Sequence, residues 1–248
     1  EGSFTVSAGA YSYTVTDANG CTSTTTGTVT EPTALVASST AGAILCNGGT
    51  TTVVVSATGG TAPYTGEGSF TVSAGAYSYT VTDANGCTST TTGTVTEPAA
   101  LVASSTAGAI LCNGGTTTVV VSATGGTAPY TGEGSFTVSA GAYSYTVTDA
   151  NGCTSTTTGT VTEPAALVAS STAGAILCNG GTTTVVVSAT GGTAPYTGEG
   201  SFTVSAGAYS YTVTDANGCT STTTGTVTEP AALVASSTAG AILCNGGT

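Results

Sequence analysis

Eight cysteines recur at a regular spacing, and their chemistry is the first that the sequence suggests. They are Cys21, Cys46, Cys87, Cys112, Cys153, Cys178, Cys219 and Cys244. Regularly spaced pairs of cysteines in small, extracellular-looking units are typical of a disulfide framework. A zinc site needs four ligands, and the chain supplies no histidine and no second close pair of cysteines. We therefore expect disulfides rather than a metal centre.

Two disulfide pairings fit this spacing. The first uses the longer interval between successive cysteines and lies within a module, as Cys46–Cys87, Cys112–Cys153 and Cys178–Cys219. The second uses the shorter interval and crosses a module boundary, as in Cys21–Cys46. We favour the first, because a count of six strands places Cys112 and Cys153 at the same end of one structural unit. Cys21 and Cys244 would then have partners outside this segment, which we expect to belong to a longer chain.

The sequence Asp149-Ala150-Asn151-Gly152 has the residue types that open a calcium-binding loop. Its copy one repeat earlier carries Asp83 and Asn85. No acidic residue follows where it would complete the ligands, although Glu163 could share an ion at the end of the repeat. We expect instead a tight turn, in which the aspartate accepts backbone hydrogen bonds. Asp83, Asn85, Asp149 and Asn151 are therefore only weak calcium candidates.

Paired carboxylates could in principle hydrolyse glycosidic bonds. Glu133, Asp149 and Glu163 recur unchanged in each copy, and no aromatic cleft is suggested between them. An enzyme has no need of many adjoining identical active sites. Without histidine or lysine, most pairs of nucleophile and base cannot be built either. We expect no enzymatic activity and no cofactor.

The charge of the chain excludes further classes of partner. It has no Lys, Arg or His, and its 12 carboxylates give a net charge of −12. Such a surface cannot neutralise nucleic-acid phosphates or attract anionic lipid, so we expect no nucleic-acid partner. The longest apolar runs, such as residues 99–103, are far shorter than the ~18 residues that a membrane span needs. We expect no membrane insertion in this segment.

All of these residues recur because the sequence repeats itself with a fixed period of sixty-six positions. Glu1 returns as Glu67, Glu133 and Glu199, and the visible substitution is Thr33, where later copies have alanine. Glu-Pro pairs punctuate the repeat, so we place module boundaries at the prolines. Residues 1–32 would be the C-terminal part of a module, and 231–248 the N-terminal part of another. Residues 33–98, 99–164 and 165–230 would be complete modules.

One repeat shows strands and no helix. Tyr143 to Thr148 alternates large and small polar residues, which is the pattern of a half-buried strand. Further strands are expected at 101–104, 116–123, 129–131, 135–138 and 154–162, which are rich in β-branched residues or alternate in the same way. Gly-Gly, Ala-Gly and Asn-Gly pairs mark turns. Six strands in each repeat predict a small immunoglobulin-like β-sandwich, with one disulfide per module.

Tyr143, with its copies Tyr77 and Tyr209, stands at the start of the penultimate strand. This position resembles the tyrosine corner of immunoglobulin-like sandwiches, where the phenol hydroxyl caps upstream backbone. We expect a structural role for these tyrosines. The core around them is thin, because a domain this small buries only ~60% of its unfolded surface. A disulfide closing about 40 residues would add roughly 3–4 kcal/mol.

The strand at 154–162 is rich in threonine and carries no charge before Glu163. Edge strands normally avoid pairing with other chains by means of lysine or proline. Because the chain has no lysine, pairing between arrays is weakly opposed, and we expect self-association into fibres. The exposed hydroxyls could also bind surface glycans or carry O-linked sugar.

Four ordered motifs resemble a known repeat. They are Cys112-Asn113-Gly114-Gly115, residues 125–130, residues 140–143 and Val147 to Cys153, closed by Glu163-Pro164. Together they are similar to the SprB-type repeat of cell-surface adhesins from gliding Bacteroidota, which is related to immunoglobulin-like and PKD-like sandwiches. The resemblance covers every repeat. It implies a secreted, filamentous or adhesive surface protein without enzymatic activity. Unlike that family, this chain has no tryptophan strand after residues 129–131, so its module is smaller.

These observations predict an all-β tandem array of such modules, one per sequence repeat, exposed outside the cell or at its surface. We expect it to act as a structural fibre or stalk. An adhesin that binds glycans or neighbouring cells through repeated weak sites is the alternative, because avidity would use the same arrangement.

Overall fold

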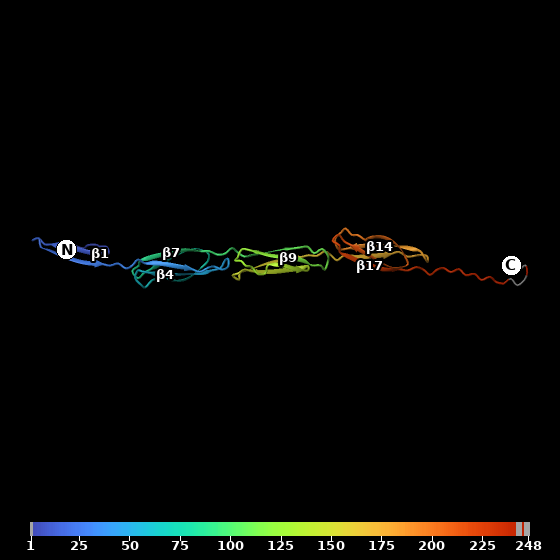
Figure 1. Ribbon diagram of the computed structural model, residues 1–248, viewed down its shortest axis with the longest axis horizontal. Coiled ribbons are helices and arrows are strands. Elements are labelled where there is room, and N and C mark those ends of the chain that lie inside the picture. Colours follow the sequence, from blue (N-terminus) through green and yellow to red (C-terminus); the bar gives the residue numbers. More distant parts are fainter. Residues whose placement is uncertain (1, 242–244, 246–248) are drawn as a thin grey trace. The chain divides into compact units, whose positions relative to one another are not determined.

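The fold is all-β over the part of the chain that the structure, a computed structural model, describes: residues 2–241 and 245. It has 17 strands and, within that range, no helix. Figure 1 shows the ribbon with several of its strands labelled. The chain divides into two compact units. One comprises Glu1–Val102, Thr124–Thr131 and Thr148–Ser155, and the other comprises Ala103–Ala123, Gly132–Val147 and Thr156–Thr248. Each unit contains one whole repeat, 33–98 or 165–230.

The strands recur in the same order in each repeat. The chain begins with β1 (Gly9–Thr16) and β2 (Thr22–Val29). Repeat 33–98 holds β3 (Val36–Ala41), β4 (Thr51–Thr58), β5 (Gly68–Val72), β6 (Gly75–Thr82) and β7 (Thr88–Val95). Repeat 99–164 holds β8 (Val102–Ala107), β9 (Thr117–Thr124), β10 (Gly134–Val138), β11 (Gly141–Thr148) and β12 (Thr154–Val161). Repeat 165–230 holds β13 (Val168–Ala173), β14 (Thr182–Thr190), β15 (Gly200–Ser205), β16 (Gly207–Thr214) and β17 (Thr220–Val227).

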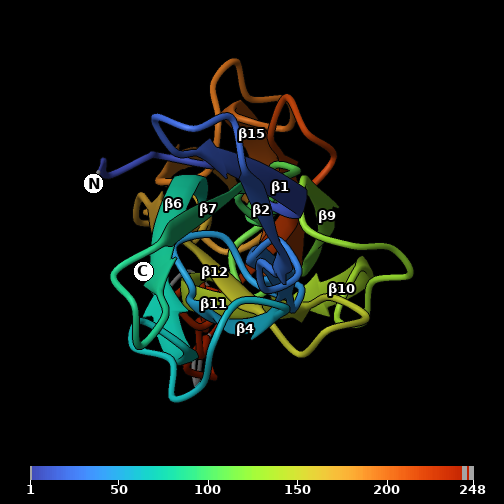
Figure 2. The ribbon, with the colours of Figure 1, turned by 90° about the vertical axis from the view of Figure 1, so that its left-hand side faces the viewer.

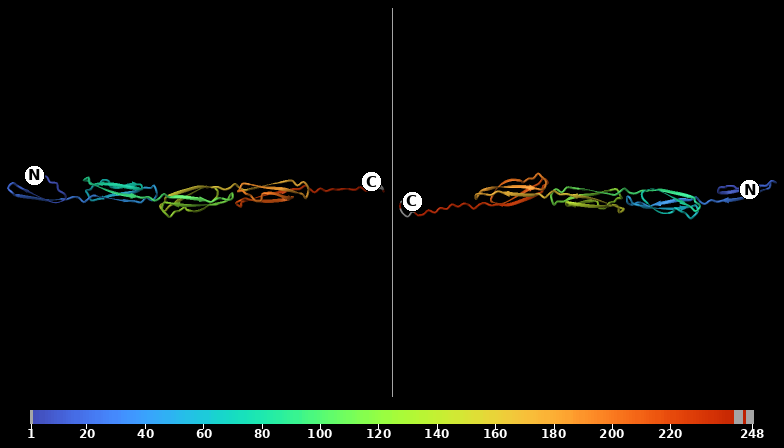
Figure 3. Two further views of the ribbon diagram at one scale, coloured as in Figure 1. Left: turned by 90° about the horizontal axis from the view of Figure 1, so that it is seen from above. Right: turned by 180° about the vertical axis from the view of Figure 1, so that it is seen from behind.

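Each complete repeat is built from two small antiparallel sheets. In repeat 33–98, β4 is the centre of a three-stranded sheet with β3 and β5, and β6 and β7 form a hairpin. The strands β6 and β7 of this hairpin are labelled in Figure 2. Repeat 165–230 has the same arrangement, with β14 in the centre. Its strands are drawn in orange in Figure 3. An Asn-Gly turn connects the two strands of each hairpin, as the sequence predicts.

The core lies between the sheet and the hairpin. Val53 and Val55 on β4 alternate with exposed neighbours, so their side chains point to one face. Val81 on β6 and Val95 on β7 meet them from the hairpin, and Ile44 closes the cluster. Phe70 and Tyr79 add a ring stack, with centroids 4.3 Å apart. The second unit has an equivalent core of Ile176, Val185, Val187, Val213 and Val227.

Five of the six expected strands form, and the sixth does not. Residues 129–131 make only an isolated bridge, in which Thr131 pairs with Thr148. Pro129 has no N–H to donate, and Gly132 follows at a positive φ of 90°, so the segment cannot extend into a ladder. Each complete repeat therefore has five strands. The first strand then starts, and the last strand ends, at opposite ends of the repeat.

The tyrosine prediction is wrong in its contact. The Tyr77 hydroxyl lies 3.2 Å from the Ser39 hydroxyl and does not cap backbone. Its copies Tyr143 and Tyr209 contact Ser105 and Ser171 in the same way. A different tyrosine caps upstream backbone, because the Tyr64 hydroxyl donates to the Gly59 carbonyl at 2.5 Å. A tyrosine therefore does cap upstream backbone in this repeat, but it is Tyr64 and not the predicted Tyr77.

Gly93 lies beneath the Tyr77 ring, and this contact gives a first prediction. A Cβ at residue 93 would come within 2.6 Å of the Tyr77 Cζ atom. Because β7 pairs residue 93 with Tyr77, the ring would have to shift to admit the methyl group and would leave its position beside Ser39. Gly93→Ala should destabilise this repeat by about 1–3 kcal/mol, the usual cost of overpacking. Urea unfolding followed by tyrosine fluorescence measures it, and an unchanged midpoint would contradict the contact.

Candidate functional site: a disulfide junction between neighbouring repeats

The turn at residues 149–153 presents one cysteine in a fixed position. Its anchor is the Asp149 carboxylate, which is only 6% exposed. One carboxylate oxygen accepts the N–H groups of Asn151 and Cys153, each at 2.9 Å. The other oxygen accepts the Thr127 N–H, also at 2.9 Å. Three backbone donors thus hold the carboxylate, and through it they hold Cys153.

The same bonds hold the carboxylate ionised. In the copy at Asp83, the Thr61 N–H has the largest effect and lowers the pKa. Burial opposes it, and the N–H groups of Cys87 and Asn85 lower the pKa further, so the net shift is downward. At Asp149 and Asp215, burial is the largest influence and raises the pKa, but the backbone donors together outweigh it.

The loop after β3 presents the other cysteine. Ile44 anchors this loop in the core at 5% exposure, and the Gly49 N–H donates to the Cys46 carbonyl at 3.0 Å. The Gly48 N–H donates to the Glu97 carboxylate at 2.6 Å, and the Asn47 amide donates to the Pro98 carbonyl at 3.1 Å. Cys46 is therefore held where the chain leaves repeat 33–98.

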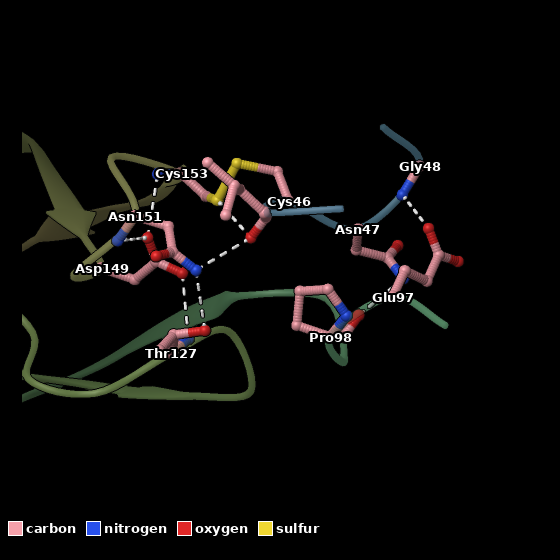
Figure 4. Close-up of a disulfide and its surroundings, with 10 residues drawn as sticks. Cys46, Asn47, Gly48, Glu97, Pro98, Thr127, Asp149, Asn151 and Cys153 are labelled. Carbon is pink, nitrogen blue, oxygen red and sulfur yellow. Dashed lines mark hydrogen bonds between the residues drawn. A yellow bond between two sulfur atoms is a disulfide. The ribbon is translucent and has the colours of Figure 1, made fainter. Parts of the chain in front are cut away.

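A disulfide joins these two segments. Cys46 bonds Cys153, with a Cα–Cα distance of 5.7 Å (Figure 4). The Asn151 amide donates to the Leu45 carbonyl at 3.1 Å and to the Thr127 hydroxyl at 3.0 Å. The Cys153 sulfur lies 3.4 Å from the same Leu45 oxygen, in a contact without a proton because the sulfur is disulfide-bonded. We call this bond, with the loop 44–49 and the turn 149–153, the junction.

The second unit contains the same junction one repeat later. Cys112 bonds Cys219, again with a Cα–Cα distance of 5.7 Å. The Asn217 amide donates to the Leu111 carbonyl at 3.1 Å. The Asn113 amide donates to the Pro164 carbonyl at 3.1 Å. Each bond closes a sequence separation of 107 residues, so each joins a repeat to the next one along the chain.

The expected pairing is therefore wrong. Cys112 does not bond Cys153, and Cys46 does not bond Cys87 or Cys21. Cys87 and Cys178, which we expected to be bonded, are exposed free thiols, as is Cys21. Cys244 lies outside the described residues. Neither of the two intervals between successive cysteines is closed by these bonds.

The number of strands explains the correction. With six strands, the cysteine after the first strand and the cysteine before the last strand lie at the same end of a module. With five strands they lie at opposite ends: Cys46 by the departing Glu97 and Pro98, and Cys87 by the arriving chain, where the Gly60 N–H donates to the Thr33 carbonyl. A bond between repeats follows from this placement. The pairing could have been predicted from the sequence only by deciding correctly whether each repeat has an odd or an even number of strands.

The calcium candidates are occupied by protein hydrogen bonds. Both oxygens of Asp83 and of Asp149 accept backbone N–H groups. Asn85 and Asn151 use their side-chain amides as donors to threonine hydroxyls. Glu163 follows the C-terminal end of β12, which is the end far from Asp149. Its carboxylate accepts the Gly114 N–H instead of joining Asp149. In the described part of the chain, no group of three His, Cys, Asp or Glu residues gathers as a metal site would require.

Acid should destabilise the chain through the three buried aspartates. Because their folded pKa values lie below the unfolded value of about 3.9, their stabilisation is present above that pH and is lost as the pH falls through the folded pKa. The triple variant with Asp83, Asp149 and Asp215 changed to Asn should have a lower Tm at pH 7 and a shallower loss between pH 4 and 2. Circular dichroism during heating measures both.

The control for this experiment is Asp17→Asn. Asp17 accepts two N–H groups of its own turn, but it is exposed. Its replacement should lower the Tm at pH 7 much less than the triple replacement does, because Asp17 is exposed. Parallel pH profiles for the chain and the triple variant would contradict the assigned role of the three aspartates.

No protein-family model matches the chain, and no curated protein matches it. The part of the chain that the structure describes includes no helix that could cross a membrane. The two disulfides indicate a non-reducing environment, of the kind found outside the cytosol.

Proposed function

We propose that the chain is a structural protein of the cell exterior, part of a fibre or stalk that is made of tandem immunoglobulin-like modules of the SprB type. The observation that carries this proposal is the junction. Each of its two covalent bonds joins one repeat to the next, as a linear array that carries load would require.

The recurrence of the junction supports this function. Its contacts are the same at Cys46–Cys153 and at Cys112–Cys219, including the bond from the asparagine amide to the leucine carbonyl. A head-to-tail contact that repeats without closing generates an open, regular assembly. The disulfide environment fits exposure outside the cytosol, and we propose the cell surface as the location.

The composition supports association between such arrays. The strands equivalent to β7 carry Thr and Ser and no charge, and alternate residues of β7 are exposed. The Thr80 and Thr90 hydroxyls form a cross-strand bond at 2.9 Å on the hairpin. Because the chain has no lysine, it lacks the residue that usually prevents an edge strand from pairing with another chain. Lateral contact between arrays is thus weakly opposed.

Electron microscopy and small-angle X-ray scattering of the purified, oxidised chain test the proposal. We expect thin particles whose longest dimension is several times their cross-section, and filaments or bundles as the protein concentration rises. A compact particle with no tendency to associate would argue against a fibre. Surface labelling of intact producing cells with an antibody against the repeat tests the location.

A further inference from the structure

We propose that the disulfides turn the array into a covalently reinforced tension element, whose length is limited even when its repeats unfold. This deepens the proposed function, because it states how a fibre of these repeats would resist load. The argument needs only the order of the bonded cysteines along the chain. It does not depend on how the two compact units are oriented.

The two disulfide loops overlap in the sequence. The first bond encloses the chain from Cys46 to Cys153, and the second encloses it from Cys112 to Cys219. Residues 112–153 therefore belong to both loops. A disulfide inside one repeat would only shorten that repeat. Because these two loops overlap, the two junctions are connected to each other by more than one segment of the chain.

Tension applied at the two ends follows the shortest covalent route. It runs from residue 1 to Cys46, crosses to Cys153, returns along the chain to Cys112, crosses to Cys219 and continues to residue 248. The stretches 1–46, 112–153 and 219–248 make up less than half of the chain. The route leaves out about 130 residues, which correspond to roughly 132 peptide links, and at about 3.3–3.6 Å per link these remove about 440–480 Å of extension.

The shielded segments carry most of the fold. Residues 47–111 and 154–218 lie off the route, and they include β4 to β8 and β12 to β16. In repeat 33–98 the load passes through β3 alone. This strand is held by its pairing with β4, by the bond from the Ala37 N–H to the Ser89 hydroxyl at 3.0 Å and by the Ser39–Thr91 hydroxyl bond at 2.8 Å. Because both ends of β3 lie on the route and the strand is already extended, these contacts hold it in register while the tension passes along it.

In a longer array with the same disulfide between repeats at every boundary, the maximum extension per repeat becomes smaller still. Consecutive cysteines such as Cys153 and Cys178 would belong to junctions two repeats apart. The short stretch between them extends to about 80–90 Å at most. Two repeats without disulfides would extend about five times further, to about 440–480 Å. Such an array would therefore stop at about one fifth of the length that it could reach without disulfides.

Single-molecule force spectroscopy tests this inference on the whole chain, held through terminal peptide tags so that no cysteine is used for attachment. We expect the fully stretched, oxidised chain to stop at less than half of its reduced length, and to gain about 440–480 Å when a reductant is added. An extension that is the same with and without reductant would overturn the proposal.

Two variants make the result specific to these bonds. Cys112→Ser leaves the Cys46–Cys153 loop alone, so the gain on reduction should fall to about 350–390 Å. Cys87→Ser combined with Cys178→Ser removes two free thiols and should keep the full gain. If the bonds were within repeats, that double variant would retain only Cys112–Cys153, and its gain would be about 140 Å.

The outcome is independent of fibre formation. Because the experiment stretches single chains, a chain that fails to form fibres would leave this result unaffected, and the reverse holds too. Failure of the proposed function and failure of the length limit are therefore distinguishable.

Discussion

Replacement of Cys153 by serine should lower the free energy of unfolding of the affected unit by up to about 4.7 kcal/mol, whereas the same replacement at Cys87 should leave it unchanged. A disulfide that closes a loop of about 100 residues restricts the unfolded chain by roughly this amount. Cys153 is bonded to Cys46, and Cys87 is free. The two cysteines occupy the same position in consecutive repeats, so their local sequences are identical.

This pair of variants is closely matched in the folded state. The N–H groups of Cys87 and Cys153 each donate to the turn aspartate at 2.9 Å, and serine keeps that donor. Guanidinium unfolding followed by tyrosine fluorescence measures the two midpoints. Equal losses for both variants would favour disulfides within repeats, and no loss for either would mean that Cys153 is not bonded.

Replacement of Gly59 by alanine should destabilise repeat 33–98 by about 3 kcal/mol or more. Gly59 follows β4 at a positive φ of 75°, and a Cβ there would collide with the Ala34 carbonyl oxygen and lie 2.9 Å from its carbon. Backbone cannot move aside as a flexible side chain does, so the cost of overpacking adds to that of the left-handed conformation. The Gly59 carbonyl also accepts the Tyr64 hydroxyl.

Gly86→Ala is the control for this substitution. Gly86 has a similar φ of 84°, but nothing lies within 4 Å of the position of an added Cβ. Its replacement should cost only about 1 kcal/mol, which is the conformational part alone. Urea unfolding of both variants measures the difference. Equal costs would mean that the arriving chain does not pass beside Gly59.

The local patterns of the sequence predict most of the fold. Alternation at residues 143–148 and the β-branched run at 116–123 correspond to β11 and β9, and the Asn-Gly turn lies between β11 and β12 as expected. These predictions succeed because strand alternation and turn geometry depend on neighbouring residues. The segment 129–131 fails because a proline and a glycine limit a run that otherwise has strand-forming residues.

The disulfide pairing could not be read from local pattern, because it depends on strand parity and on contacts between repeats. One extra strand in the count moves Cys153 to the wrong end of its module. The partner group of Asn151 was also hidden, since the Leu45 carbonyl is 106 residues away and any residue type carries a carbonyl. The residue types around Leu45 therefore could not indicate that its carbonyl accepts this hydrogen bond.

The thin core is supported differently from the sequence-based expectation. We expected a disulfide inside each module to compensate for it. Instead, within repeat 33–98, the valines of β4 and β6 pack with Phe70 and Tyr79, and hydroxyl contacts such as Ser39–Thr91 tie β3 to the hairpin. The turn aspartate satisfies three backbone donors. Both disulfides join consecutive repeats and do not staple a single core.

Non-reducing fragment analysis tests the bond between repeats most directly. Because the repeats are nearly identical, small peptides around Cys46 and Cys112 cannot be told apart. A protease that cleaves after glutamate, but not before proline, cuts the alkylated, denatured chain after Glu67, Glu133 and Glu199. The fragments 2–67, 68–133, 134–199 and 200–248 then carry two cysteines each, and Thr33 marks the first by its mass.

The account predicts two covalent species in the mass spectrum. Fragment 2–67 should be joined to one of the two middle fragments through Cys46–Cys153, and fragment 200–248 to the other through Cys112–Cys219. Bonds within repeats would instead join all four fragments into one species. Bonds of the Cys21–Cys46 kind would leave four separate fragments. Either of these last two results would contradict the junction.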